Sequence, residues 1–110
     1  MQRTALITGG SRGIGAACAR ALAAGGHRVT IQYLVSEAAS QALAAEIGGS
    51  AVRADVTDAG QVRQMFDTAG PVDILVCSAG ISLIKLFTET TEEEWRRLLD
   101  TNLGGVINCC

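Results

Sequence analysis

Glycines are concentrated near the start of the chain, in the segment Thr8-Gly9-Gly10-Ser11-Arg12-Gly13-Ile14-Gly15. The segment lies between a predicted strand and a predicted helix, which is the context of a phosphate-binding turn. Gly9 allows a sharp turn off the strand, Gly13 lets a pyrophosphate approach the backbone, and Gly15 lets helix and strand pack closely. The helix start adds free N–H groups and a positive dipole end. The segment therefore predicts a dinucleotide-binding site.

Two further groups of residues that could carry chemistry lie where predicted strands end. Asp55 follows a third apolar run, and Gly80 follows a fourth. In a doubly wound sheet, ligands bind beyond the carboxyl ends of the strands. We therefore expect Gly9, Asp55 and Gly80 to lie at the same edge of the sheet.

The second predicted strand ends without an acidic residue, because no Asp or Glu occurs from His27 to Ser36. Sites that prefer NAD usually place a carboxylate there, where it binds the ribose 2′-hydroxyl and repels a 2′-phosphate. The guanidinium of Arg12 can pair with such a phosphate, and Tyr33 and Ser36 could add contacts. The alternative is that Arg12 is a solvated cation of the turn. We predict NADP(H) as the cofactor in preference to NAD(H).

The elements that position these residues alternate between strand and helix. The predicted strands are Thr4–Thr8, Val29–Tyr33, Ala51–Ala54 and Val72–Cys77. The predicted inner faces of the helices are Ile14, Cys18, Ala21 and Leu22 in the first, Ala39, Leu43 and Ile47 in the second, Val62, Phe66 and Ala69 in the third, and Trp95, Leu98, Leu99 and Asn102 in the last. Capping boxes are expected at Asp58 with Gln61 and at Thr91 with Glu94. The pattern predicts an α/β fold, a Rossmann-type doubly wound parallel sheet of about four strands with flanking helices.

Composition excludes several classes of partner. The chain of 110 residues suits one domain, and its net charge of -2 offers no positive field for nucleic acid. No apolar run approaches the ~20 residues that a membrane helix needs. The four cysteines show no metal-binding spacing, so reduced thiols in a cytoplasmic protein are expected.

The glycine segment resembles the TGxxxGIG signature of the short-chain dehydrogenase/reductase family, and the resemblance covers essentially the whole chain. It implies that Asp55 lies beside the adenine and Val56 against its face, and that Ala79 and Gly80 border the nicotinamide-side ribose. It also implies a catalytic role for Asn102, which would support the family's lysine through a water. Taken together, the residue patterns and the family resemblance predict a set of cofactor-binding residues. They are Thr8, Gly9, Ser11, Arg12, Gly13, Ile14, Gly15, Tyr33, Asp55, Val56, Ser78, Ala79 and Gly80.

Plainer interpretations of these matches stay open. Asp55 could be a turn residue at a strand end, and Asn102 a polar break in a helix. The chain also departs from the family, which usually has two asparagines where Cys77-Ser78 stands. The hydrogen bonds that brace the fourth strand would then be partly lost, or remade by the Ser78 hydroxyl.

The family's chemistry needs a tyrosine that donates a proton and a lysine four residues later. Here the single tyrosine is Tyr33 and the single lysine is Lys85, so no such pair exists. We therefore expect residues 1–110 to be the incomplete N-terminal domain of a longer enzyme, inactive alone. An exposed edge at the fourth strand would lower its solubility.

The resemblance is to NADPH-dependent 3-oxoacyl-[acyl-carrier-protein] reductases in particular, and it implies a small carbonyl or acyl-carrier substrate and a homo-oligomer. One alternative is a reductase of the aminopentanone group on elongation factor P. Another is a non-catalytic nucleotide-binding or regulatory module. An unrelated flavodoxin-like domain is disfavoured, because the several motifs would have to coincide by chance.

Overall fold

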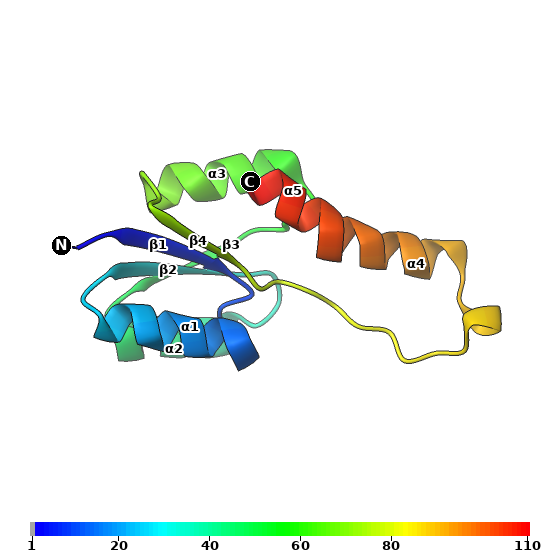
Figure 1. Cartoon of the computed structure of the whole chain (residues 1–110), viewed down its shortest axis with the longest axis horizontal. Coiled ribbons are helices and arrows are strands. Elements are labelled where there is room, and N and C mark those ends of the chain that lie inside the picture. The colour runs from blue at the N-terminus through cyan, green and yellow to red at the C-terminus, as the bar shows by residue number, and fades with distance from the viewer. Residues whose placement is uncertain (1) are drawn as a thin grey trace.

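The computed structural model describes residues 2–110 as a four-stranded parallel sheet with helices on both faces (Figure 1). The elements are β1 (Thr4–Thr8), α1 (Gly13–Ala24), β2 (Arg28–Tyr33), α2 (Glu37–Ile47), β3 (Ser50–Arg53), α3 (Ala59–Ala69), β4 (Ile74–Cys77), a 3₁₀ turn (Phe87–Glu89), α4 (Glu92–Leu99), a π-helical turn (Asp100–Gly104) and α5 (Gly105–Cys109). The predicted alternation of strands and helices is confirmed. The bounds of β2, β3 and β4 differ from the predicted ones by one or two residues.

The strands lie in the order β3-β2-β1-β4, and each neighbouring pair is parallel. The chain therefore runs outward from β1 to β3 and then returns to place β4 on the other side of β1. Thr8 at the end of β1 pairs with Gln32 of β2 and with Cys77 of β4, so three strands end at one level. The order reverses between β1 and β4, which is where doubly wound sheets bind ligands. As expected, β4 is an edge strand.

The side chains of β1 alternate between two apolar layers. Ala5 and Ile7 pack with the layer under α1 and α2, and Leu6 packs with the layer under α3 and α5. Figure 1 shows α1 and α2 together on one side of the sheet and α3 and α5 on the other. A strand covered on both faces has a nearly continuous run of apolar residues in its sequence, as β1 has.

The predicted inner face of α1 is confirmed in part, because Cys18 and Leu22 pack against the core whereas Ile14 and Ala21 do not. Ile14 is 77% exposed and Ala21 is also exposed. The buried positions are small residues, namely Gly15, Ala16 and Ala19. Because the helix begins at Gly13 and approaches the sheet closely, small residues occupy its fully buried positions, and Ile14 in the first turn is exposed.

The predicted inner faces of α2 and α3 are largely confirmed, because Leu43 and Ile47 of α2 and Val62, Phe66 and Ala69 of α3 all pack against the core. Ser40 is fully buried where Ala39 was expected, and Ala39 is exposed. The Ser40 hydroxyl donates to the carbonyl of Ser36 at 2.6 Å, which satisfies it inside the core. In α3 the predicted Val62 is buried and Phe66 is half-buried, and Met65 is a buried residue that was not predicted. In α4, Trp95 and Leu99 are exposed, because this helix extends away from the sheet (Figure 1).

The two predicted capping boxes have different outcomes. Thr91 and Glu94 form the complete reciprocal box at the start of α4. Asp58 caps α3 by accepting from the amides of Gly60 and Gln61. The predicted return bond of Gln61 is wrong, because its side-chain oxygen accepts from the amide of Asp55 at 2.9 Å and the Asp58 amide bonds to the Asp55 carbonyl. Gln61 thus ties the start of α3 to the end of β3.

We expect the start of α4 to weaken in acid. The Glu94 carboxylate accepts from Lys85 Nζ at 2.8 Å and from the Thr91 amide at 3.0 Å. These bonds, that of Lys85 first, lower the pKa of Glu94 from 4.5 to about 2. Because the pKa is lowered in the folded state, their stabilisation is complete above pH 4.5 and is lost as the pH falls toward 2. The protection factors of the α4 amides, which remove the pH dependence of intrinsic hydrogen exchange, should fall across this range.

The matched comparison for this acid effect is Glu94→Gln against Glu93→Gln. Glu93 is an exposed residue of the same first turn. The acid-dependent fall of the protection factors should be absent in Glu94→Gln and persist in Glu93→Gln. Equal behaviour of the two variants would contradict the role assigned to Glu94.

No helix within residues 2–110 is long and apolar enough to cross a membrane.

Candidate functional site

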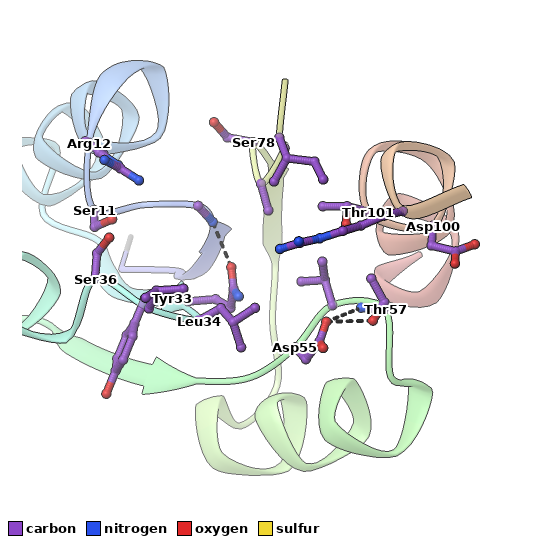
Figure 2. Close-up of a pocket in the computed structure, with 18 of the residues that line it drawn as sticks. Ser11, Arg12, Tyr33, Leu34, Ser36, Asp55, Thr57, Ser78, Asp100 and Thr101 are labelled. Carbon is purple, nitrogen blue, oxygen red and sulfur yellow. Dashed lines mark hydrogen bonds between the residues drawn. The ribbon is translucent and has the colours of Figure 1, made fainter. Parts of the chain in front are cut away.

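An open pocket of about 1120 Å³ lies beyond the carboxyl ends of the strands, at the point where the strand order reverses (Figure 2). Its walls come from the glycine segment, the end of β2 (residues 32–36), the segment after β3 (55–57), the segment after β4 (78–81), and one side of α4 with the turn after it. The predicted meeting of Gly9, Asp55 and Gly80 at one edge is confirmed. The contribution of α4 was not predicted.

The three glycines of the predicted motif have distinct structural roles. Gly9 and Gly13 have φ angles of +63° and +61°, which favour glycine. A Cβ atom on Gly15 would lie 2.2 Å from the carbonyl oxygen of Gly9, so the helix and the turn are in backbone contact. A Cβ atom on Gly13 would have no heavy atom within 4 Å, and Gly13 lines the pocket. The turn and packing roles are thus confirmed, and the backbone at Gly13 leaves space for a ligand.

The start of α1 leaves its first amides for a ligand. The residue before the helix is Arg12, in extended backbone conformation, and its side chain makes no capping hydrogen bond. By contrast, the first turns of α3 and α4 are capped by Asp58 and Thr91. Uncapped amides at a helix start, next to an open glycine turn, form a binding site for an anion such as a phosphate.

A buried amide that the sequence analysis missed holds this turn in place. Gln32 is 3% exposed in β2. Its Nε2 donates to the Ala54 carbonyl at 2.6 Å, and its Oε1 accepts from the Gly9 amide at 2.8 Å. One side chain therefore links the glycine segment to the end of β3. The available signal was a glutamine inside a predicted strand of otherwise β-branched and aromatic residues, Val29–Tyr33.

Thr8 and Gly10 support the pocket from below. Thr8 is 2% exposed, and its Oγ1 accepts from the amides of Ser78 and Ala79, both at 3.1 Å. Thr8, rather than the Ser78 hydroxyl, therefore braces the end of β4, and neither Thr8 nor Gly15 is among the residues that line the pocket. A Cβ atom on Gly10 would lie 2.6 Å from the Ile31 side chain, a constraint that the motif did not reveal.

The pocket has a positive end. In Figure 2, Ser11 and Arg12 lie at the same end of the pocket as Tyr33 and Ser36, and Asp100 and Thr101 lie at the opposite end. The glycine segment contributes the guanidinium of Arg12 to this end of the pocket. Neither the glycine segment nor the end of β2 contributes a carboxylate. This end of the pocket favours an anionic group.

Asp55 and Val56 form the floor next to α3. The Asp55 carboxylate accepts from the amide and the hydroxyl of Thr57 at 2.9 and 2.7 Å. Asp55 is therefore the turn residue of the plainer interpretation, and it also lines the pocket. Val56 is buried against α5, where a Cβ atom on Gly105 would lie 2.7 Å from it. Both residues present a fixed surface to a ligand.

Asn102 lies in the π-helical turn and outside the pocket lining. Its side-chain oxygen accepts from the Ile81 amide at 2.8 Å, and its side-chain nitrogen donates to the Ile81 carbonyl at 2.9 Å. The amide thus fastens the segment after β4 to the helix. A catalytic role for Asn102 stays a prediction.

Comparison with known proteins gives a consistent result. The family model described as short chain dehydrogenase matches residues 3–110. The chain is 38% identical to an acetoacetyl-CoA reductase of Paracoccus denitrificans and 39% identical to a 3-oxoacyl-[acyl-carrier-protein] reductase of Staphylococcus aureus, over 98% and 99% of its length. These alignments cover 46% and 48% of the two relatives, so the chain spans about half their length.

A solved structure shows the same fold with a cofactor. It is a short chain dehydrogenase from Burkholderia cenocepacia in complex with NADP, with a TM-score of 0.91 and 38% identity. The match covers 97% of this chain and 47% of that one.

Proposed function

Because the chain belongs to the short chain dehydrogenase family, we propose that it is the cofactor-binding N-terminal part of an NADP(H)-dependent carbonyl reductase. The observation that carries the proposal is the pocket at the strand-order reversal, where uncapped α1 amides meet the open backbone of Gly13. A bound nicotinamide supplies hydride, and the residues of this chain bind and orient the dinucleotide. The relative of known structure that binds NADP supports this assignment.

The preference for NADP(H) over NAD(H) rests on charge at one end of the pocket. Tyr33 ends β2, at the place where an NAD-preferring site usually has a carboxylate. Arg12 lines the same end of the pocket. A 2′-phosphate would therefore find a guanidinium and no opposing carboxylate from these two segments.

We expect Arg12→Gln to separate the two cofactors. Hydrogen bonds to a charged group contribute about 1.5–3 kcal/mol, so the Kd for NADPH should rise about 10- to 100-fold. The Kd for NADH, which lacks the 2′-phosphate, should change much less. Titrations followed by the fluorescence of the reduced nicotinamide measure both constants.

Arg63→Gln is the matched control, because Arg63 is exposed on α3 and outside the pocket. It should leave both constants unchanged. Tighter binding of NADH than NADPH by the unaltered chain would contradict the proposed preference. Failure to bind either cofactor would contradict the proposed function.

Reduction itself needs residues other than those described. The Tyr33 side chain is buried at the end of β2, and Lys85 is paired with Glu94 at 2.8 Å. They are 52 positions apart and form no proton-donating pair. We therefore propose that this segment binds the cofactor and that turnover requires a further part of the protein.

The names of the relatives support a substrate class. The two curated relatives are reductases of acetoacetyl-CoA and of 3-oxoacyl-[acyl-carrier-protein]. We propose a 3-oxoacyl thioester as the substrate of the whole protein. A homo-oligomeric state and a cytoplasmic location stay predictions.

A further inference from the structure

The wall that α4 gives to the pocket carries two adjacent arginines, Arg96 and Arg97. The guanidinium of Arg96 binds the Glu92 carboxylate at 2.8 Å and lies 5.0 Å from the centre of the Trp95 ring. The side chain of Arg97, by contrast, takes part in no hydrogen bond or ion pair within residues 2–110. Arg97 is therefore the arginine of this wall that is available to a ligand.

The charges around Arg97 disfavour a phosphate as that ligand. Carboxylates outnumber guanidinium groups on this side of the pocket, where the acidic lining residues are Asp55, Glu92, Glu93 and Asp100. The phosphates of a dinucleotide fit better at the other end, beside Arg12 and the uncapped start of α1. The side of Arg97 suits a part of the ligand that carries no negative charge.

The sheet indicates which uncharged part of the cofactor this is. Tyr33 at the end of β2 is paired with Arg53 of β3, and its carbonyl accepts from the Ala54 amide at 3.0 Å. The segment 55–57 therefore lies next to the end of β2. Adenine and the 2′-phosphate of NADP(H) are attached to the same ribose. A phosphate beside Arg12 thus places the adenine over this segment rather than the nicotinamide.

Val56 connects this floor to the helix that bears Arg97. Asn108 Nδ2 donates to the Val56 carbonyl at 2.9 Å, and a Cβ atom on Gly105 would lie 2.7 Å from the Val56 side chain. Because α4 continues through the π-helical turn into α5, Thr101 and Arg97 lie about one and two helical turns before Gly105. Both line the pocket, where Figure 2 shows Thr101. The floor and the wall of Arg97 are therefore adjacent.

We propose that Arg97 is a further cofactor-binding residue, whose guanidinium stacks on the adenine of NADP(H) on the face opposite Val56. A guanidinium is planar, always charged and weakly hydrated, so it stacks well on an aromatic face. This assignment rests on the proposed function and adds a contact from α4. Because NADPH and NADH share the adenine, Arg97 contributes to the binding of both, whereas Arg12 distinguishes between them.

The test compares Arg97→Met with the unaltered chain. Methionine keeps an unbranched apolar side chain but loses the charged plane. The Kd values for NADPH and NADH are measured by nicotinamide fluorescence, and that for adenosine 2′,5′-bisphosphate, which has no nicotinamide, by calorimetry. We expect all three to rise by a similar factor of about 3 to 30. The factor should be the same at low and high salt, because salt screens an ion pair with a phosphate more than it weakens stacking.

Arg63→Met is the matched control, because Arg63 is exposed on α3 outside the pocket and the change removes the same charge. It should leave all three constants unchanged, and circular dichroism should show both variants folded. A loss in Arg97→Met for NADPH alone would overturn the assignment. So would a loss for the two dinucleotides without one for the bisphosphate, a loss that shrinks in high salt, or an equal loss in Arg63→Met.

The same measurements separate this assignment from the proposed function. If the unaltered chain binds NADPH and Arg97→Met binds all three ligands equally well, the adenine contact is wrong and the cofactor site stands. If the unaltered chain binds neither NADPH nor NADH, the proposed function and the adenine contact are both overturned.

Discussion

Replacing Gln32 by leucine is expected to lower the free energy of unfolding by about 2–5 kcal/mol. Leucine fills a similar volume but leaves the Gly9 amide and the Ala54 carbonyl without their partners. Each buried polar group that loses its hydrogen bond costs about 1–3 kcal/mol. Total stabilities are only about 5–15 kcal/mol, so the loss would be a large part of the whole. Urea unfolding followed by circular dichroism measures it.

A matched control for this substitution exists on the surface. Gln41→Leu makes the same chemical change at an exposed position of α2, and it should alter stability by less than about 0.5 kcal/mol. Where Gln32→Leu is still folded, the loosened turn should also weaken NADPH binding. A Gln32→Leu protein as stable as the Gln41→Leu protein would refute the bracing role of this amide.

Replacing Gly15 by alanine is the second large effect that we expect. The new methyl group would lie 2.2 Å from the Gly9 carbonyl oxygen and 3.1 Å from the Gly10 Cα. These neighbours are backbone atoms, so α1 must move away from the turn. Overpacking of a well-packed contact costs about 1–3 kcal/mol, occasionally more. We expect about 3 kcal/mol here, and a loss of NADPH binding because the helix start is displaced.

Gly104→Ala is the control that distinguishes the effect of this clash on stability from the effect of replacing any helical glycine by alanine. Gly104 is helical, with φ -58°, and the nearest atom to its added Cβ is the Leu99 carbonyl oxygen at 3.8 Å. Alanine there should be neutral or stabilise the protein by up to about 1 kcal/mol. If thermal unfolding shows that the Gly15→Ala protein is as stable as the Gly104→Ala protein, the close contact assigned between α1 and the glycine turn would be contradicted.

Local patterns in the sequence predicted much of the candidate site. The glycine segment could be recognised because its glycines are spaced as a sharp turn between a strand and a helix requires. This requirement depends only on residues that are neighbours in the sequence. Asp55 and Gly80 could be placed beside it because parallel strands end at a common edge. The box formed by Thr91 and Glu94 involves four consecutive residues, so its prediction needed no knowledge of the rest of the fold.

Predictions failed where the choice depended on depth of packing. Ile14 and Ala39 fit a helical period, yet both are exposed. Periodicity limits the buried face to about one side of a helix but cannot say how closely that helix approaches the sheet. Close approach favours Gly15, Ala16 and Ser40 in the contact. The side-chain oxygen of Gln61 likewise accepts from the amide of Asp55 rather than from the amide of its own helix cap, Asp58.

The sequence by itself determined the order of strands and helices, the position of the glycine turn and the absence of an acid at the end of β2. Only the tertiary structure decided that Gln32 joins Gly9 to Ala54 and that Asn102 holds Ile81. The physical reason is distance along the chain. Backbone preference and hydrophobic period act over a few residues, whereas these contacts join residues 21 to 23 positions apart and form only after the sheet and its helices have packed.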